Sequence, residues 1–238
     1  MPFGDPLSID VDALFRDVGM FESRKTWTAA GFRVVDRSNN GKIMVASHPS
    51  VRGLLFKKYA SDISLEDQHK NYERRIEGAR RLRSLVDARR LRHVAVPRKW
   101  LVELPRAFSR RGPSHVLVVE QLDVLDDDQT AAAYRQIDPG VLAELCFVVF
   151  RFRGMDSNTK NIPFVADGRI AFIDTEHWDR GSSKSYLHHI NGQLSSDRRK
   201  MAKRIFEQLE DGEDAVRRDF DGEEDTSPSS SSSSPSSS

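Results

Sequence analysis

The sequence GMDSNTKN at residues 154–161, followed by IDTE at residues 173–176, decides how the fold of this chain is interpreted. It places a carboxylate at Asp156, an amide five positions later at Asn161, and a second carboxylate at Asp174. Asp and Asn in a loop are usually turn formers and helix caps. The segments on either side therefore decide between that structural role and a chemical one.

The flanking segments predict a buried helix before this loop and a β-hairpin after it. Residues 140–153 are apolar on nearly every face, which is typical of a helix inside a core. Short apolar runs at residues 162–165 and 170–173 surround the turn sequence Ala166-Asp167-Gly168, which is typical of a hairpin. This context favours a chemical role, because a second carboxylate follows the hairpin at a suitable distance along the chain.

The rest of the chain predicts an α+β fold. A long helix is expected at about residues 66–88, because Ile76, Ala79, Leu82 and Val86 recur at roughly helical spacing. Strands or extended segments are expected at residues 32–35, 42–46, 54–59, 94–97, 100–104 and 116–120. Further helices are expected at residues 126–133, 196–209 and 213–220. Strands dominate the first half and helices the second, which predicts two lobes.

The composition excludes several classes of protein. The chain has 37 Lys and Arg against 36 Asp and Glu, so no global charge indicates nucleic acid or a membrane surface as the main partner. Cys146 is the only cysteine, which excludes an intrachain disulfide and a cysteine-based metal cluster, and its apolar helix indicates a core residue. No membrane span and no Sec-type signal peptide are expected. These features predict a cytoplasmic location, with export by a specialised route left open.

The charges are nonetheless segregated along the sequence. Eight arginines lie between residues 74 and 92, and residues 207–225 are mostly acidic. The arginines are most simply a solvated helix face, and a docking patch for an acidic or phosphorylated partner is the alternative. After residue 226 the chain is Ser and Pro only, so residues 222–238 are predicted to be a disordered tail.

The order of the predicted elements and the spacing of three side chains resemble the protein-kinase-like fold. That family carries H-R-D-x-x-x-x-N in its catalytic loop and D-F-G at the end of a hairpin. Asp156 matches the catalytic Asp, Asn161 matches the metal-binding Asn, and Asp174 matches the metal-binding Asp of D-F-G. The resemblance extends from Pro139 to Glu176.

The resemblance also implies roles for residues upstream of this stretch. Lys57, on the third predicted strand, would contact the nucleotide phosphates, and Lys58 would point to the opposite face. Either Glu77 or Glu73 on the long helix would be the ion-pair partner of Lys57. Glu120 and Leu122 lie where the family receives an adenine edge through backbone groups, with Glu120 as a marker of the position rather than a chemical participant.

The chain departs from the family pattern in several places. Gly154-Met155 replaces His-Arg, Asp174-Thr175-Glu176 replaces D-F-G, and neither G-x-G-x-x-G nor A-P-E is present. These departures resemble minimal or atypical kinases, of the compact sort found in bacterial effector-like proteins. The implied architecture is a two-lobed protein-kinase-like fold with a truncated helical C-lobe and a disordered tail. Its expected divisions are an N-terminal extension (1–30), an N-lobe (31–125), a short helical C-lobe (126–221) and the tail (222–238).

The resemblance implies a phosphotransferase that depends on ATP and Mg²⁺ and acts on a hydroxyl of a protein or small molecule. Asp174 and Asn161 would hold Mg²⁺, Lys57 would steady the phosphates, and Asp156 would orient the acceptor hydroxyl. The alternative is a pseudokinase that uses the same fold for nucleotide binding or scaffolding, as the missing glycine-rich loop suggests. A nucleic-acid-binding arginine helix is disfavoured, because the net charge is near neutral and no stacking aromatics interleave the arginines.

Overall fold

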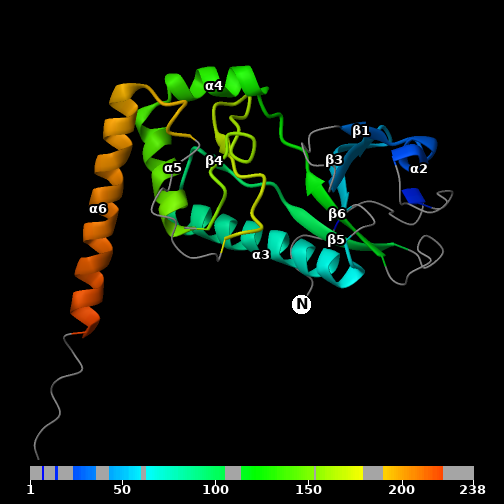
Figure 1. Ribbon diagram of the computed structural model, residues 1–238, viewed down its shortest axis with the longest axis horizontal. Helices are drawn as coiled ribbons and strands as arrows, with labels where there is room; N and C mark the ends of the chain where they lie inside the picture. The colour runs from blue at the N-terminus through cyan, green and yellow to red at the C-terminus, as the bar shows by residue number, and fades with distance from the viewer. Residues whose placement is uncertain are drawn as a thin grey trace, which may run out of the picture.

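The chain folds into a five-stranded sheet on one side and a group of helices on the other, with α3 lying along both (Figure 1). The computed structural model describes residues 7, 14–15, 24–35, 43–59, 63–104, 114–152, 154–178 and 190–221, with the backbone alone at 114 and 213–221. The α+β class predicted from the sequence is confirmed. None of the described helices is long and apolar enough to cross a membrane.

The larger sheet is antiparallel, and its strand order is β1-β2-β3-β6-β5. Its strands are β1 (Arg33–Val35), β2 (Ile43–His48), β3 (Val51–Tyr59), β5 (Lys99–Leu104) and β6 (Ser114–Glu120). Lys57 of β3 pairs with Leu117 of β6, which in turn pairs with Leu101 of β5. The predicted pairing of the first two strands is confirmed, and the turn predicted at residues 39–41 lies outside the described residues.

Each face of this sheet is covered by a different part of the chain. One face carries Phe56 and Val118, which pack against Phe15, Phe32 and the Trp27 of α2 (Arg24–Ala29). All five side chains are 0–2% exposed. Strand alternation turns the neighbouring residues to the opposite face, where α3 packs. The segment predicted as an N-terminal extension therefore contributes to the folded core, because its aromatic side chains cover one face of the sheet.

Helix α3 (Leu65–Arg89) is the element that both halves of the molecule share, and it confirms the predicted long helix. Ser64 caps its start by accepting a hydrogen bond from the Asp67 backbone N–H at 3.0 Å. Ile76 packs with the sheet, whereas Leu82, farther along the same helix, belongs to the core of the helical half. The helix therefore fixes the two halves relative to each other.

The helical half is built around α5 (Pro139–Arg151), which is buried as the sequence predicted. Asp138 caps α5 and Asp126 caps α4 (Asp127–Arg135), each through a side-chain oxygen on a backbone N–H of the first turn. Helix α6 (Ser196–Asp221) packs against α5 and is one continuous helix, where the sequence left one or two helices open. The predicted tail, residues 222–238, lies outside the described residues.

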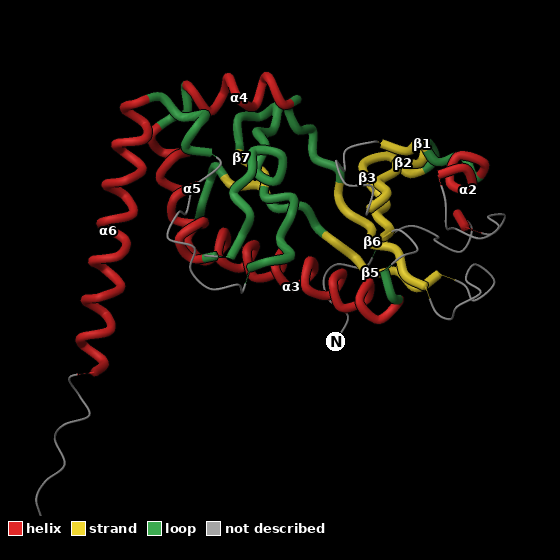
Figure 2. Tube along the Cα trace, in the orientation of Figure 1, coloured by secondary structure: helices red, strands yellow, loops and turns green. Residues whose placement is uncertain are grey.

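The segment 154–178 runs between the sheet and α5, mostly as loop, and is drawn green in Figure 2. The predicted hairpin is present in its backbone hydrogen bonds, with Val165 N donating to Arg169 O at 2.7 Å around Gly168, whose φ is +87°. Its second arm also forms a short parallel sheet, in which β7 (Ile170–Ala171) pairs with β4 (Val94–Ala95). Residues 170–173 are therefore held from both sides.

Candidate functional site

Asp156 and Asn161 lie side by side, because the loop that follows α5 is closed by its own hydrogen bonds. The Asn161 amide Nδ2 donates to Asp156 Oδ2 at 2.9 Å, and the Asn158 backbone N–H donates to Asp156 Oδ1 at 3.2 Å. Met155 and Ser157 are buried and anchor the loop, whereas Asp156 is exposed. With Nδ2 bonded to the carboxylate, the amide oxygen of Asn161 is turned away from it. We call Asp156 and Asn161 the loop pair.

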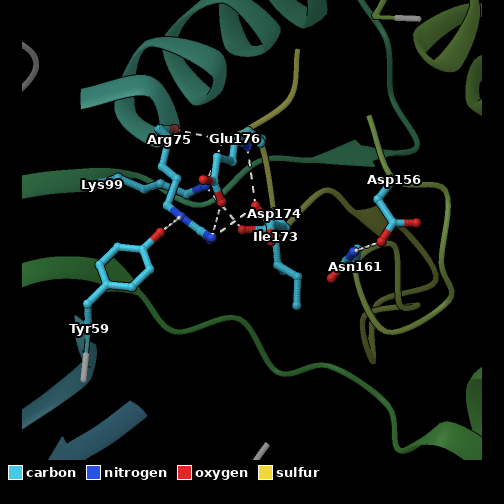
Figure 3. A network of polar contacts seen from close by, with 9 residues as sticks. Tyr59, Arg75, Lys99, Asp156, Asn161, Ile173, Asp174 and Glu176 are labelled. Carbon is cyan, nitrogen blue, oxygen red and sulfur yellow. Dashed lines mark hydrogen bonds and ion pairs between the residues drawn. The ribbon is translucent and has the colours of Figure 1, made fainter. Parts of the chain in front are cut away.

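Asp174 is connected to the loop pair through the backbone. The Ile173 N–H donates to Asn161 O at 3.0 Å, so the residue before Asp174 is bonded directly to the loop. Figure 3 shows Ile173 and Asp174 together with the loop pair. The Asp174 carboxylate is 32% exposed and accepts hydrogen bonds at Oδ1 from Arg75 Nη1 at 3.0 Å and from the Glu176 N–H at 3.2 Å. Burial opposes its ionisation, but the charges of Arg75, Lys99 and Lys57 hold the pKa of Asp174 below its usual value.

Arg75 of α3 is the centre of the contacts around Asp174. Its side chain is 8% exposed, and its guanidinium donates to Asp174, to Glu176 Oε2 and, at 3.3 Å, to the hydroxyl of Tyr59. The guanidinium carbon also lies 5.9 Å from the centre of the Tyr59 ring. An arginine buried with two carboxylates and a hydroxyl uses the fork geometry of its donors fully. The helix therefore enters the site with a cation.

Lys99 of β5 is a second buried cation beside Asp174. It is 3% exposed, and its Nζ donates to Ile173 O at 3.1 Å and to Thr175 Oγ1 at 2.8 Å. The Thr175 hydroxyl in turn donates to Arg75 O at 2.7 Å. Burial, and then the neighbouring charge of Lys57, lower the pKa of Lys99 well below its usual value. We call Arg75, Lys99, Asp174, Thr175 and Glu176 the buried cluster.

Gly78 allows the 174–178 segment to lie directly on α3. A Cβ atom at this position would lie 2.1 Å from Thr175 O and 2.7 Å from Trp178 Cδ1. Because Gly78 has no side chain, the backbone of Thr175 can approach the helix closely enough for the Thr175 hydroxyl to reach Arg75 O. The glycine thus sets the distance on which the buried cluster depends.

Lys57 lies on the strand face directed at α3, near Asp174. It is half-buried on β3, and its charge acts on both Asp174 and Lys99. The structure gives other partners to both glutamates that were expected to pair with Lys57. Glu77 accepts hydrogen bonds from Arg80 and Arg81 at 2.6–2.8 Å, and Glu73 pairs with His69 at 3.2 Å.

The phase of the helix directs both glutamates away from Asp174. Residues two positions apart lie about 200° apart around an α-helix, so Glu73 and Glu77 point away from the side where Arg75 meets Asp174. The hydrogen bonds from Arg80, opposed by some burial and joined by those from Arg81, lower the pKa of Glu77 to about 2. Its charge is thus committed to the outer surface of α3.

Glu120 and Leu122 end the sheet where an adenine edge was expected. The Glu120 carboxylate accepts a hydrogen bond from the Arg98 N–H at 3.0 Å, which is a structural role. Leu122 packs with the apolar cluster of Ala95, Val165 and Ala171. Within the part of the chain that the structure describes, the Leu122 backbone N–H has no hydrogen-bond partner.

The sequence interpretation missed Arg75 and Lys99 as site residues and assigned no role to Thr175. A signal for Arg75 existed, because it continues the spacing of the buried side chains Tyr72, Ala79 and Leu82 along α3. A charged residue on a buried helix stripe requires a partner of opposite charge. Lys99 is likewise a buried charged residue at the start of its strand, but no local pattern identified the acceptors of its hydrogen bonds.

The oxygen atoms available around Asp174 are too few to bind a metal ion by themselves, but they fit a Mg²⁺ ion that is also coordinated by phosphates. Across the described ranges, no three His, Cys, Asp or Glu side chains gather to hold a metal ion. Nucleotide-bound Mg²⁺ uses one or two carboxylates, with phosphates and waters as the other ligands. Asp174 Oδ2 and the Asn161 amide oxygen meet that requirement in kind. No protein-family model matches the chain, and no curated protein matches its sequence.

Proposed function

We propose that this chain is an atypical, kinase-like phosphotransferase that moves the γ-phosphoryl group of ATP to a hydroxyl on a protein or small molecule. The observation that carries the proposal is the hydrogen bond between Ile173 N and Asn161 O. It keeps the loop pair and Asp174 on adjacent segments, with Lys57 close enough for its charge to act on Asp174. A carboxylate for the acceptor, an amide oxygen and carboxylate for Mg²⁺, and a lysine for the phosphates are the parts that phosphoryl transfer requires.

Each residue has one task in this proposal. Asp174 Oδ2 and the Asn161 amide oxygen would hold Mg²⁺, which supplies neutralisation of the phosphate charge when it is bound. Lys57 contacts the phosphates as a point charge. Asp156 is exposed at the loop, where it orients the acceptor hydroxyl and accepts its proton. Catalysis then consists of positioning and charge stabilisation.

The nucleotide base is assigned to the end of the large sheet. The Leu122 N–H without a partner among the described residues would donate to the adenine edge. The apolar side chains beside it, Val124 and Ile173, would contact the face of the base. The order of an antiparallel sheet with α3, followed by mostly helical structure, supports the two-lobed, kinase-like interpretation.

The test is a thermal shift assay with ATP in the presence and absence of Mg²⁺. We expect a Mg²⁺-dependent rise in Tm for the wild type, because a ligand that binds only the folded state stabilises it. Asp174→Asn keeps the side-chain shape and is expected to lose this rise. Asp167→Asn is the matched control, because Asp167 is exposed in the hairpin turn and pairs with Arg169. A wild type without any Mg²⁺-dependent shift would refute the proposal.

A non-catalytic pseudokinase is the second candidate, and the contact of Arg75 with Asp174 favours it. A carboxylate that already has a cation partner binds metal less strongly than one without such a partner. Incubation with γ-labelled ATP and a cell lysate discriminates between the two. Label transfer that disappears in Asp156→Asn supports the phosphotransferase, and nucleotide binding without any label transfer supports the pseudokinase.

A further inference from the structure

We infer that this site takes up one divalent cation with its nucleotide, because Arg75 occupies the side of Asp174 that a second cation would need. The inference rests on the proposed function, and it specifies the metal content of that same site. Kinases of the ordinary type bind two Mg²⁺ ions between an Asp, an Asn and the phosphates. Here a side chain of α3 supplies one of the positive charges.

The first argument is the use of the two carboxylate oxygens. A carboxylate shared by two cations presents one oxygen to each of them. Oδ1 of Asp174 already accepts hydrogen bonds from Arg75 Nη1 at 3.0 Å and from the Glu176 N–H at 3.2 Å. Within the described residues, Oδ2 has no such donor, so one oxygen is left for a metal ion. A second ion at Oδ1 would also meet the positive guanidinium at close range.

The second argument is that Arg75 cannot readily move away. Its guanidinium keeps its charge at every physiological pH, and it bonds Glu176 and the Tyr59 hydroxyl as well as Asp174. The side chain is 8% exposed, and that of Glu176 is 15% exposed. Removing the cation would leave two carboxylates partly buried without their partner, which is strongly unfavourable.

The third argument is that none of the described acidic residues around Asp174 is free to act as a ligand for a second ion. Glu176 is paired with Arg75, and both oxygens of Asp156 accept hydrogen bonds from the loop. Lys99 adds a donor group rather than an acceptor on the same side of Asp174, with its Nζ fixed on Ile173 O and Thr175 Oγ1. Arg75 therefore serves as the built-in equivalent of one metal ion.

The experiment counts metal ions with Mn²⁺ as the probe. The full chain is saturated with Mn²⁺ and a non-hydrolysable ATP analogue, and the metal and nucleotide retained with the protein are measured after ultrafiltration, with the filtrate subtracted. We expect one Mn²⁺ per bound nucleotide in the wild type. We expect a second Mn²⁺ in the double variant Arg75→Met/Glu176→Gln, which removes the cation without leaving the charge of Glu176 unpaired.

Two controls complete the design. Arg81→Met removes an exposed arginine of the same helix and should keep the ratio at one. Arg75→Lys retains a cation and should also keep the ratio of Mn²⁺ to nucleotide at one. This variant keeps the inference testable if the double variant fails to fold. Two ions per nucleotide in the wild type, or a second ion in Arg75→Lys, overturns the inference while the proposed function stands. No retained nucleotide at all overturns the proposed function itself.

Discussion

The loop pair and the buried cluster lie on neighbouring segments and are held in opposite ways. Asp156 and Asn161 are five residues apart, and the bonds that fix them lie within one loop, in which Asp156 is exposed. The buried cluster joins α3, β5 and the 174–178 segment, with Arg75 and Asp174 separated by 99 positions. The first is therefore local in sequence and solvated, and the second is assembled only by the complete fold.

This difference predicts that the two groups of residues contribute differently to activity and to stability. A solvated loop contributes little to the free energy of unfolding and can move to meet an acceptor. Charged groups taken out of water are instead strongly interdependent, because each one depends on its partners for compensation. We therefore expect substitutions in the buried cluster to act mainly on stability and those in the loop pair to act mainly on activity.

Replacing Arg75 should have the largest effect on stability. Arg75→Met is expected to lower the free energy of unfolding by about 3 kcal/mol, at the low end for a broken buried pair, because Asp174 keeps partial contact with water. Urea unfolding of the wild type and the variant measures this loss. The control is Arg81→Met, whose side chain is 50% exposed and pairs with Glu77 at the surface, with an expected loss of less than about 1 kcal/mol. Equal losses in both variants would contradict the comparison.

Gly78→Ala should have the next largest effect. The new Cβ would lie 2.1 Å from a backbone oxygen of Thr175, so the 174–178 segment must shift away from α3. We expect a loss of about 2 kcal/mol, in the range for overpacked positions. Gly212→Ala on α6 is the matched control, because its Cβ meets open space and the helix should gain about 0.5 kcal/mol or more. A neutral Gly78→Ala would show that the segment is not held against the helix.

The loop pair and Asp174 could be predicted from the sequence, because local patterns surround them. Asp156, Asn161 and Asp174 were identified because their spacing follows elements with clear local signals, namely an apolar helix with an Asp-Pro start and a hairpin turn at Gly168. The order of strands and helices followed from periodicity in the same way. Each of these features depends on residues that are close along the chain.

The partners within the buried cluster depend on contacts that no local pattern specifies. Lys99 and Thr175 are 76 positions apart, and Thr175 and Arg75 are 100 apart. An acidic partner for Lys57 was expected on α3, where the fold directs Arg75 at Asp174. Here the helix directs an arginine, rather than a glutamate, at the segment after β7, and the partners of that arginine are Asp174 and Glu176. Only the three-dimensional arrangement reveals that exchange.

The stability difference between wild type and Arg75→Met should depend on pH. Burial raises the pKa of Asp174, but the charges of Arg75 and then of the lysines lower it by more than burial raises it. The pKa of Asp174 in the folded state therefore lies below its unfolded value of about 3.9. Its contribution is therefore present above that pH and is lost as the pH falls through the folded value. Without Arg75 the pKa of Asp174 in the folded state rises, and the contribution of Asp174 to the free energy of unfolding becomes smaller. Urea unfolding at pH 7 and pH 3 should show a smaller difference at pH 3, and an unchanged difference would contradict this assignment.

The smallest effect on stability is expected in the loop pair. Asp156→Asn should change the free energy of unfolding by less than about 0.5 kcal/mol, because the side chain is exposed and water can replace the one hydrogen bond that a single amide oxygen cannot accept. The same substitution removes the only negative charge of the loop pair, so phosphoryl transfer should fall by about 100-fold or more if Asp156 accepts the proton. Urea unfolding and transfer of label from γ-labelled ATP measure the two effects on one sample. A variant that loses stability but retains transfer would reverse the comparison, because the loop pair would then be structural and the chemistry would belong to the buried cluster.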